Sequence, residues 1–133
     1  MAITFSVPGD PVPQPRPRIT VRGRHGHAYV PKDHAIHAYR QAVALAARAA
    51  GASVHEEPAS VVIDFVFARP KSHMRKNGLA ANAPRLPRPD IDNLEKAVLD
   101  ALKGVAWKDD TQVARVVKEK SWGIEGRTTV RIT

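Results

Sequence analysis

The chain has 133 residues, 43% apolar and 5% aromatic, so we expect a single domain over residues 1–133 with one largely aliphatic core, and a wholly disordered chain is excluded. Lys and Arg number 21 against 13 Asp and Glu, a net charge of +8 that favours a polyanionic partner such as nucleic acid. Since the chain has no cysteine, no apolar run near the roughly 18 residues that span a bilayer and no charged leader, we expect a cytoplasmic protein without disulfides, thiolate metal sites or membrane segments.

The first thirty residues alternate apolar strand patterns with prolines and glycines. Alternating apolar and polar residues predict a half-buried strand over residues 2–7. Five prolines between positions 8 and 17 cannot donate to a sheet, so this segment is expected to be a stiff connector that exposes Arg16 and Arg18. Residues 19–30 are expected to form a short hairpin with its turn at the two glycines.

The middle of the chain combines two regular elements with one irregular segment. Apolar residues at helical spacing predict an Ala-rich helix from Asp33 to about Ala50, which Gly51 ends. The segment Ser60–Ala68 is β-branched and aromatic, which is typical of a central strand. Residues 69–89 hold six Lys or Arg, four prolines and no carboxylate, and we interpret them as a basic surface loop.

The last third of the chain predicts a second helix and two strands. An apolar stripe, with Asp90 in the N-cap position and Gly104 beyond its end, predicts a helix from Asp90 to Leu102. Segments Gln112–Lys118 and Arg127–Ile132 are expected to be strands joined as a hairpin. The order of elements predicts an α+β domain: a small mixed β-sheet with two α-helices packed on one face.

Carboxylates concentrate in one part of this basic chain. Six of the thirteen fall in residues 90–110, where a uniform spread would put about two. Two carboxylates about 4 Å apart repel by roughly 4 kcal/mol at an effective dielectric constant near 20, so a cation is needed to offset them. Mg²⁺ accepts carboxylate oxygens and turns an acidic pocket into a phosphate-binding site. The cluster therefore favours a divalent metal site, and its members are Asp90, Asp92, Glu95, Asp100, Asp109 and Asp110.

Helical spacing orders several of these residues. Asp90 and Asp92 fall in the first turn of the predicted helix, where the dipole and free N–H groups favour anions. Lys96 and Asp100 follow at four and eight residues from Asp92, on the face away from the apolar stripe. The acidic pair after the helix joins them only if the chain folds back. In the alternative, Asp90 only caps the helix and the others form a solvated face in which Lys96 pairs with Asp92 or Asp100.

Residues 88–102 and 107–113 together hold the combination Asp-x-Asp-Asn-x-x-Lys followed by Asp-Asp. This combination resembles the RusA family of Holliday-junction resolvases. The Pro-Gln-Pro-Arg-Pro-Arg of residues 13–18 and the Pro-Lys-Ser-His of residues 70–73 resemble its phage-type members, so most of the chain is covered. The resemblance implies a RusA-like homodimer, a Mg²⁺-dependent endonuclease of DNA recombination and repair that cuts four-way junctions symmetrically, with Mn²⁺ as a substitute metal.

The resemblance also assigns roles to individual positions. The acidic metal ligands match Asp90, Asp92 and Asp110, and the essential lysine matches Lys96. Asp109 stays an alternative ligand, because the connection after the helix is slightly shorter than in the family. The carboxylates would hold one or two Mg²⁺ ions that activate water and stabilise the leaving oxygen. Lys96 would meet the charge that develops on phosphorus, since an ammonium acts as a point charge for phosphate.

Other residues are candidates for contacts around such a site. Asn93 either bonds a ligating carboxylate or supports the helix cap. Positive charge dominates residues 11–32 and 69–89, and these residues are expected to contact DNA backbones, with a solvated basic face as the alternative. The candidate cations are Arg16, Arg18, Arg22, Arg24, Lys71, Arg75, Lys76, Arg85 and Arg88.

The aromatic residues and the histidines each allow two interpretations. Tyr29, Trp107 and Trp122 either stack on unpaired bases or belong to the core, and we favour the core. The spacings of His25 with His27 and His34 with His37 suit a metal, but surface histidines are the preferred interpretation. The alternative to the endonuclease as a whole is a small basic nucleic-acid-binding protein without catalysis.

Overall fold

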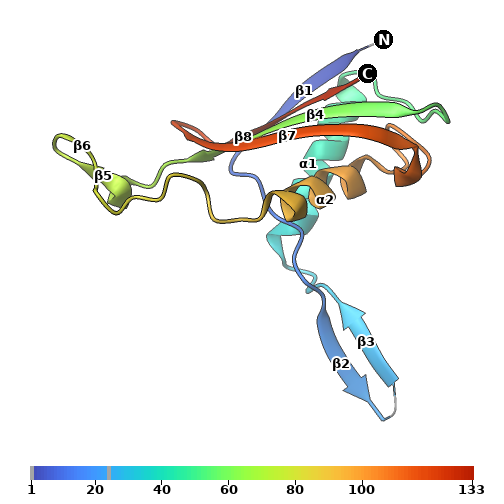
Figure 1. The fold of residues 1–133 in the computed structure, drawn as a ribbon. Helices are drawn as coiled ribbons and strands as arrows, with labels where there is room; N and C mark the ends of the chain where they lie inside the picture. Colours follow the sequence, from blue (N-terminus) through green and yellow to red (C-terminus); the bar gives the residue numbers. More distant parts are fainter. Residues whose placement is uncertain (1, 24) are drawn as a thin grey trace.

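A four-stranded mixed sheet organises the chain in the computed structural model, which describes residues 2–23 and 25–133, without the side chains of Thr20, Arg22 and His25. The strand order is β1-β8-β4-β7, with β1 antiparallel to β8, β8 antiparallel to β4, and β4 parallel to β7 (Figure 1). The strands are β1 (Ile3–Pro8), β4 (Ala59–Ala68), β7 (Val113–Gly123) and β8 (Arg127–Ile132).

The two last strands do not form the hairpin that the sequence predicted. β4 lies between them, and it pairs with β7 on one edge and with β8 on the other. The parallel pair β4 and β7 needs a long crossover, and the connection between them contains the second helix. Residues 124–126 then cross the end of β4. A Cβ added to Gly126 would lie 2.6 Å from the backbone nitrogen of Asp10, so the close approach of Gly126 to Asp10 requires glycine.

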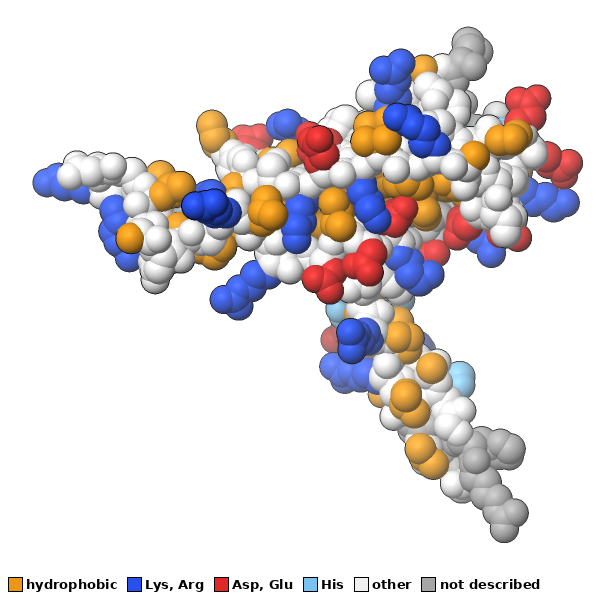
Figure 2. Space-filling view, viewed as in Figure 1, with side chains coloured by type: hydrophobic (Ala, Val, Ile, Leu, Met, Phe, Trp, Pro, Cys, Tyr) orange, Lys and Arg blue, Asp and Glu red, His pale blue; other side chains and the backbone are white. Residues whose placement is uncertain are grey.

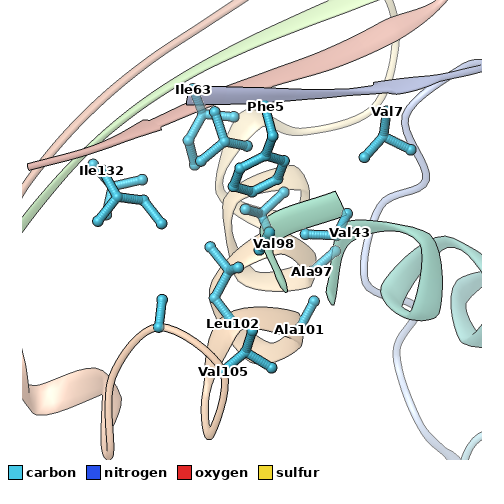
Figure 3. Packing of buried hydrophobic residues seen from close by; sticks show 14 of the residues in the cluster. Phe5, Val7, Val43, Ile63, Ala97, Val98, Ala101, Leu102, Val105 and Ile132 are labelled. Atoms are coloured by element: carbon cyan, nitrogen blue, oxygen red, sulfur yellow. The ribbon is translucent and has the colours of Figure 1, made fainter. Parts of the chain in front are cut away.

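Both helices lie on the same face of the sheet (Figure 1), which confirms the predicted α+β architecture. They are α1 (Ala35–Ala49) and α2 (Ile91–Leu102). Figure 3 shows Phe5 and Ile63 of the sheet directed toward Val98 of α2, with Val43 of α1 beside them. No helix in the described part of the chain is long and apolar enough to cross a bilayer.

Local signals in the sequence set the helix boundaries close to where they were predicted. His34 is the N-cap of α1, and its Nδ1 accepts a hydrogen bond from the Ile36 amide at 3.0 Å. Asp90 is the N-cap of α2, as predicted, and Gly104 follows that helix with a φ of 78°. Tyr39 ties α1 to the sheet through a 2.6 Å hydrogen bond to Thr128, and burial raises the pKa of its phenol to about 12.

Two small hairpins extend away from the sheet and helices (Figure 1). The first, β2 (Arg18–Arg22) with β3 (His25–Tyr29), confirms the hairpin predicted for residues 19–30. The second pairs β5 (Met74–Arg75) with β6 (Gly78–Leu79) after a single 3-10 turn at Lys71–His73. Residues 69–89 therefore contain regular structure that the prediction of a plain loop missed.

Candidate metal and nucleic-acid site

The start of α2 presents two carboxylates to solvent. Asp90 occupies the N-cap position, but its side chain forms no capping hydrogen bond. The alternative in which the Asp90 carboxylate only caps the helix therefore does not describe this structure, where only the backbone of Asp90 acts as the cap. Asp92 is exposed, and its Oδ1 accepts a 2.9 Å hydrogen bond from the Asn93 amide. Neither carboxylate forms an ion pair with any residue that the structure describes. Both side chains therefore keep oxygens available for a ligand.

Farther along α2, Asp100 is paired with two cations. Its carboxylate lies 3.0 Å from a guanidinium nitrogen of Arg40 and 3.4 Å from Lys96 Nζ. The sequence allowed Lys96 to pair with Asp92 or Asp100, and the structure shows the pair with Asp100. The side chain of Lys96 is 62% exposed and this contact is long, so the ion pair is weak and the ammonium is free to move toward a phosphate.

The proline-rich connector is fastened to α2 beside this pair. The Gln14 amide donates a 2.9 Å hydrogen bond to the Asn93 carbonyl, and the Gln14 side-chain oxygen accepts one from Arg40. Asn93 thus supports the start of α2 through its backbone, and its backbone N–H also lies 3.1 Å from the Asp90 carbonyl. The role of its side chain toward a ligating carboxylate stays a prediction.

The two acidic residues after α2 have local structural partners. Trp107 Nε1 donates a 2.9 Å hydrogen bond to Oδ1 of Asp110, and the Trp107 side chain is fully buried, as the core interpretation expected. Asp109 Oδ1 accepts from the Thr111 amide at 3.3 Å and forms a capping box with Gln112. Among the described residues Asp110 therefore keeps one carboxylate oxygen unused, and Asp109 caps the short 3-10 turn Asp110–Gln112.

Asp110 lies at the opposite end of α2 from the first two carboxylates. Lys118 of β7 bonds Glu95 at 2.8 Å, and Lys120, farther along the strand, bonds the Pro89 carbonyl at 2.8 Å. β7 thus runs from the end of α2 toward its start, and Asp110 precedes β7. The twelve residues of α2 rise by roughly 18 Å in total.

The three predicted ligands are therefore not brought together within one chain. Across residues 2–23 and 25–133 no three His, Cys, Asp or Glu side chains form a group that fits a metal. Asp90 and Asp92 alone still fit a hard divalent cation, because proteins hold Mg²⁺ through one or two carboxylates together with waters and substrate phosphates. The ligand set of three stays a prediction.

The predicted DNA-contacting cations lie at the surface, on or near the two hairpins and on the segment that leads into α2. Figure 2 shows Lys and Arg side chains along the β5–β6 hairpin and at the base of the β2–β3 hairpin, with acidic side chains on the body between them. Within the described part of the chain, none of these cations forms an ion pair with a carboxylate. Arg24 and the side chain of Arg22 fall outside the described residues. The exposed candidates are Arg16, Arg18, Lys71, Arg75, Lys76, Arg85 and Arg88.

Several cations beside α2 were missed by the sequence analysis. Lys118 and Lys120 point toward α2 from β7, and their spacing of two residues along a strand was the signal that could have placed both on one face. Arg40 reaches Asp100 from α1, and no local pattern marks that contact between two helices.

The histidines take structural roles where the structure shows their contacts. His34 caps α1, and His37 Nε2 lies 2.9 Å from the Pro31 carbonyl. The sequence analysis preferred surface positions for this pair, but both side chains are half-buried. The side chain of His25 is outside the described part, so its preferred interpretation as a surface histidine stays a prediction.

Comparison with known proteins identifies the family. The sequence model of the family described as endodeoxyribonuclease RusA matches residues 8–133, which include both free aspartates, Lys96 and the acidic pair. The chain is also 33% identical over 136 aligned residues to the uncharacterized protein YqaN of Bacillus subtilis strain 168, covering 98% of this chain and 94% of that protein. The resemblance predicted from the Asp-x-Asp motif is thus confirmed, and the matched family consists of endonucleases that act on DNA. The chain belongs to the RusA family of endodeoxyribonucleases.

Proposed function

We propose that this protein is a divalent-metal-dependent endonuclease that resolves four-way DNA junctions by paired, symmetric hydrolysis of phosphodiester bonds. The observation that carries the proposal is the pair Asp90 and Asp92 at the start of α2. These carboxylates have no cationic partner among the described residues, although the chain has a net charge of +8. A binding protein without catalysis gains nothing from two unpaired carboxylates near its phosphate-binding surface, since they repel DNA.

The side chains divide the work as follows. Asp90 and Asp92 hold Mg²⁺, or Mn²⁺ in its place, and the bound ion supplies water activation and charge stabilisation at the leaving oxygen. Lys96 lies one helical turn beyond Asp92 and offers its mostly exposed ammonium to the phosphate. Asp100, itself neutralised by Arg40, keeps that ammonium close to the helix until DNA binds.

A homodimer reconciles Asp110 with the other two predicted ligands. In one chain the length of α2 separates Asp110 from Asp90 and Asp92. A two-fold axis that sets two α2 helices antiparallel would place the end of one helix beside the start of the other. Asp110 of a second copy then completes the site with its unused oxygen. Two such sites, related by the same axis, suit paired cuts in a nearly two-fold junction.

The exposed cations on the two hairpins supply the electrostatic part of DNA binding. Each lysine or arginine that neutralises a phosphate releases counterions, so affinity falls steeply with salt. We expect Arg16 and Arg18 at the start of the first hairpin, and Lys71, Arg75 and Lys76 on or just before the second, to contact backbone phosphates on the junction arms. Arg85 and Arg88 lead directly to Asp90 and would contact the strand that is cut.

Incubation of the purified protein with a synthetic four-way junction and with a linear duplex of the same sequence tests the proposal. With Mg²⁺ we expect paired nicks in the junction and an intact duplex, and with chelator no cleavage. Thermal melting in Mg²⁺ or Mn²⁺ against chelator gives a second readout, because an ion that binds the folded state raises the midpoint. Junction binding without cleavage in either metal, together with an unchanged midpoint, would overturn the assignment.

A further inference from the structure

A cavity of about 350 Å³ lies between the end of β4, the 3-10 turn and the segment that leads into α2. We propose that this cavity binds an unstacked nucleobase of the DNA next to the cleaved bond, and that Trp122 is the wall against which the base lies. The inference rests on the proposed nuclease function and deepens it, since it assigns the cavity a role in choosing where the strand is cut. Its volume falls within the range of small-ligand pockets.

The indole of Trp122 is held in place from several sides. Its ring meets Phe67 and His73 edge to face, with centroids 6.4 and 5.4 Å apart. Its Nε1 donates a 3.1 Å hydrogen bond to the Pro84 carbonyl, and the Arg69 guanidinium lies 4.9 Å from the ring centroid. The side chain is nevertheless only partly buried and lines the cavity. A fixed, partly exposed indole is a stacking surface for a flat base, because every base has a π-face.

The remaining walls are rigid and mostly apolar. Four prolines line the cavity, and their fixed φ angles give it a preformed shape: Pro70, Pro84, Pro87 and Pro89. Asp10 is the one carboxylate among the described lining residues. Its Oδ1 accepts from the Ala68 amide at 2.9 Å, which leaves Oδ2 to accept from an amino group of a base. Apolar walls with one or two polar groups are typical of sites that orient a heterocycle.

The charges around the cavity favour a nucleotide over an apolar peptide. Arg88 lines the cavity, and the Arg69 guanidinium lies over the ring of Trp122, which is one of its walls. The adjoining 3-10 turn adds the exposed Lys71, and the β5–β6 hairpin adds the exposed Arg75 and Lys76. A peptide side chain that fills an apolar pocket has no use for this many cations, whereas a base enters with its phosphates attached.

The position of the cavity links it to the reaction. Arg88 and Pro89 line it, and Asp90 follows at once in the chain, about 4 Å away between successive Cα atoms. Lys120 holds this segment in place by donating a hydrogen bond to the Pro89 carbonyl at 2.8 Å. A base in the cavity therefore places its own phosphate within reach of the start of α2. Occupation of the cavity by a preferred base then selects the bond that is cut.

Photocrosslinking tests this placement on the wild-type protein. Four-way junctions carry 5-iododeoxyuridine at single positions around the cut site, and they are irradiated with the protein in chelator so that no cleavage occurs. We expect one or two positions to crosslink, and mass spectrometry to locate the adduct at Trp122 or His73. Binding of the junction without any adduct on the lining residues would overturn the inference while leaving the nuclease proposal intact. Failure of the wild type to bind or cut junctions would overturn the nuclease proposal itself.

Variants of Trp122 supply the functional arm. Trp122→Ala is expected to lower the cleavage rate about tenfold and to flatten the preference among junctions of different sequence, because one stacking contact is lost. Trp122→Phe keeps an aromatic wall and is expected to retain most of the preference. Ile124→Ala, at a neighbouring residue that is 97% exposed, is the matched control and should behave as wild type. An unchanged sequence preference in a folded Trp122→Ala variant contradicts the inference. If Trp122→Ala does not fold, the inference is tested by Trp122→Phe and by the crosslinks.

Discussion

The two ends of α2 carry the same kind of side chain in opposite states. At its start, Asp90 and Asp92 are exposed and form no ion pair with any described residue. Toward its end, Asp100 is paired with Arg40, and Asp110 accepts a hydrogen bond from the buried Trp107. A count of carboxylates in one stretch of sequence therefore overstates the number that a single chain can offer to one metal.

The difference arises from what packs against each end. Where β7 passes the start of α2, Lys120 bonds a backbone carbonyl, so it neutralises neither Asp90 nor Asp92. At the other end, α1 contributes Arg40, and the turn after the helix buries an indole whose N–H needs an acceptor. Carboxylates without such partners are the ones that a metal can bind without displacing a cation.

The largest expected effect concerns the free end of the helix. Asp90→Asn or Asp92→Asn should lower Mg²⁺-dependent cleavage of a four-way junction by at least about a hundredfold, because a metal ligand is lost. Junction affinity, measured by gel shift in chelator, should stay equal or rise, since a negative charge facing phosphate is removed. Asp33→Asn, at another exposed aspartate before α1, should cut at the wild-type rate. If either helix variant cleaved at the wild-type rate, the proposal of a metal site at the start of α2 would be wrong.

A mixing experiment tests whether the two ends meet across a dimer. Asp90→Asn and Asp110→Asn chains are expected to be inactive alone. If the site combines Asp90 of one copy with Asp110 of the other, a mixed dimer contains one site with both changes and one site with neither. Unfolding and refolding the two variants together should therefore restore single nicks in the junction.

The control mixture joins Asp90→Asn with Asp92→Asn. Both residues belong to the same end of α2, so each site of the mixed dimer keeps one change and no activity returns. Nicking by the control mixture would contradict a shared site. So would the absence of nicking by the first mixture, provided that ultracentrifugation shows that each variant still forms dimers.

A smaller effect is expected at the ion pair between Lys96 and Asp100. Lys96→Ala should lower the cleavage rate by about ten- to a hundredfold with little change in junction affinity, because its charge matters most in the transition state. Lys96→Arg should recover part of this loss. Asp100→Asn should change the rate only a few-fold, since Asp100 positions Lys96 and touches neither DNA nor metal in our proposal. Equal losses from Lys96→Ala and Asp100→Asn would place Asp100 in the reaction as well.

Local signals predicted one end of the site well and the other poorly. The N-cap at Asp90, the bounds of α2 and the spacing of Lys96 from Asp92 follow from helix geometry, so the sequence placed them correctly. Contacts between distant segments left no such signal. The insertion of β4 between β7 and β8, the pairing of Arg40 with Asp100 and the position of Asp110 all depend on how the crossover closes the sheet. Alternation within a strand predicts which face is buried, but it does not identify the neighbouring strand.

The smallest expected effect is on stability, and it tests the difference between the two ends of α2 independently of catalysis. Asp110→Ala removes the acceptor of the fully buried Trp107 N–H, and an unsatisfied buried donor costs about 1–3 kcal/mol of unfolding free energy. Asp110→Asn keeps an acceptor oxygen in the same place and should unfold close to wild type. Asp90→Ala should also leave stability near wild type, because its side chain makes no capping bond. Urea denaturation of the three variants in chelator measures these differences. A loss of stability in Asp90→Ala as large as in Asp110→Ala would show that Asp90 caps the helix in solution, and its carboxylate would then have to leave the cap before it could bind a metal.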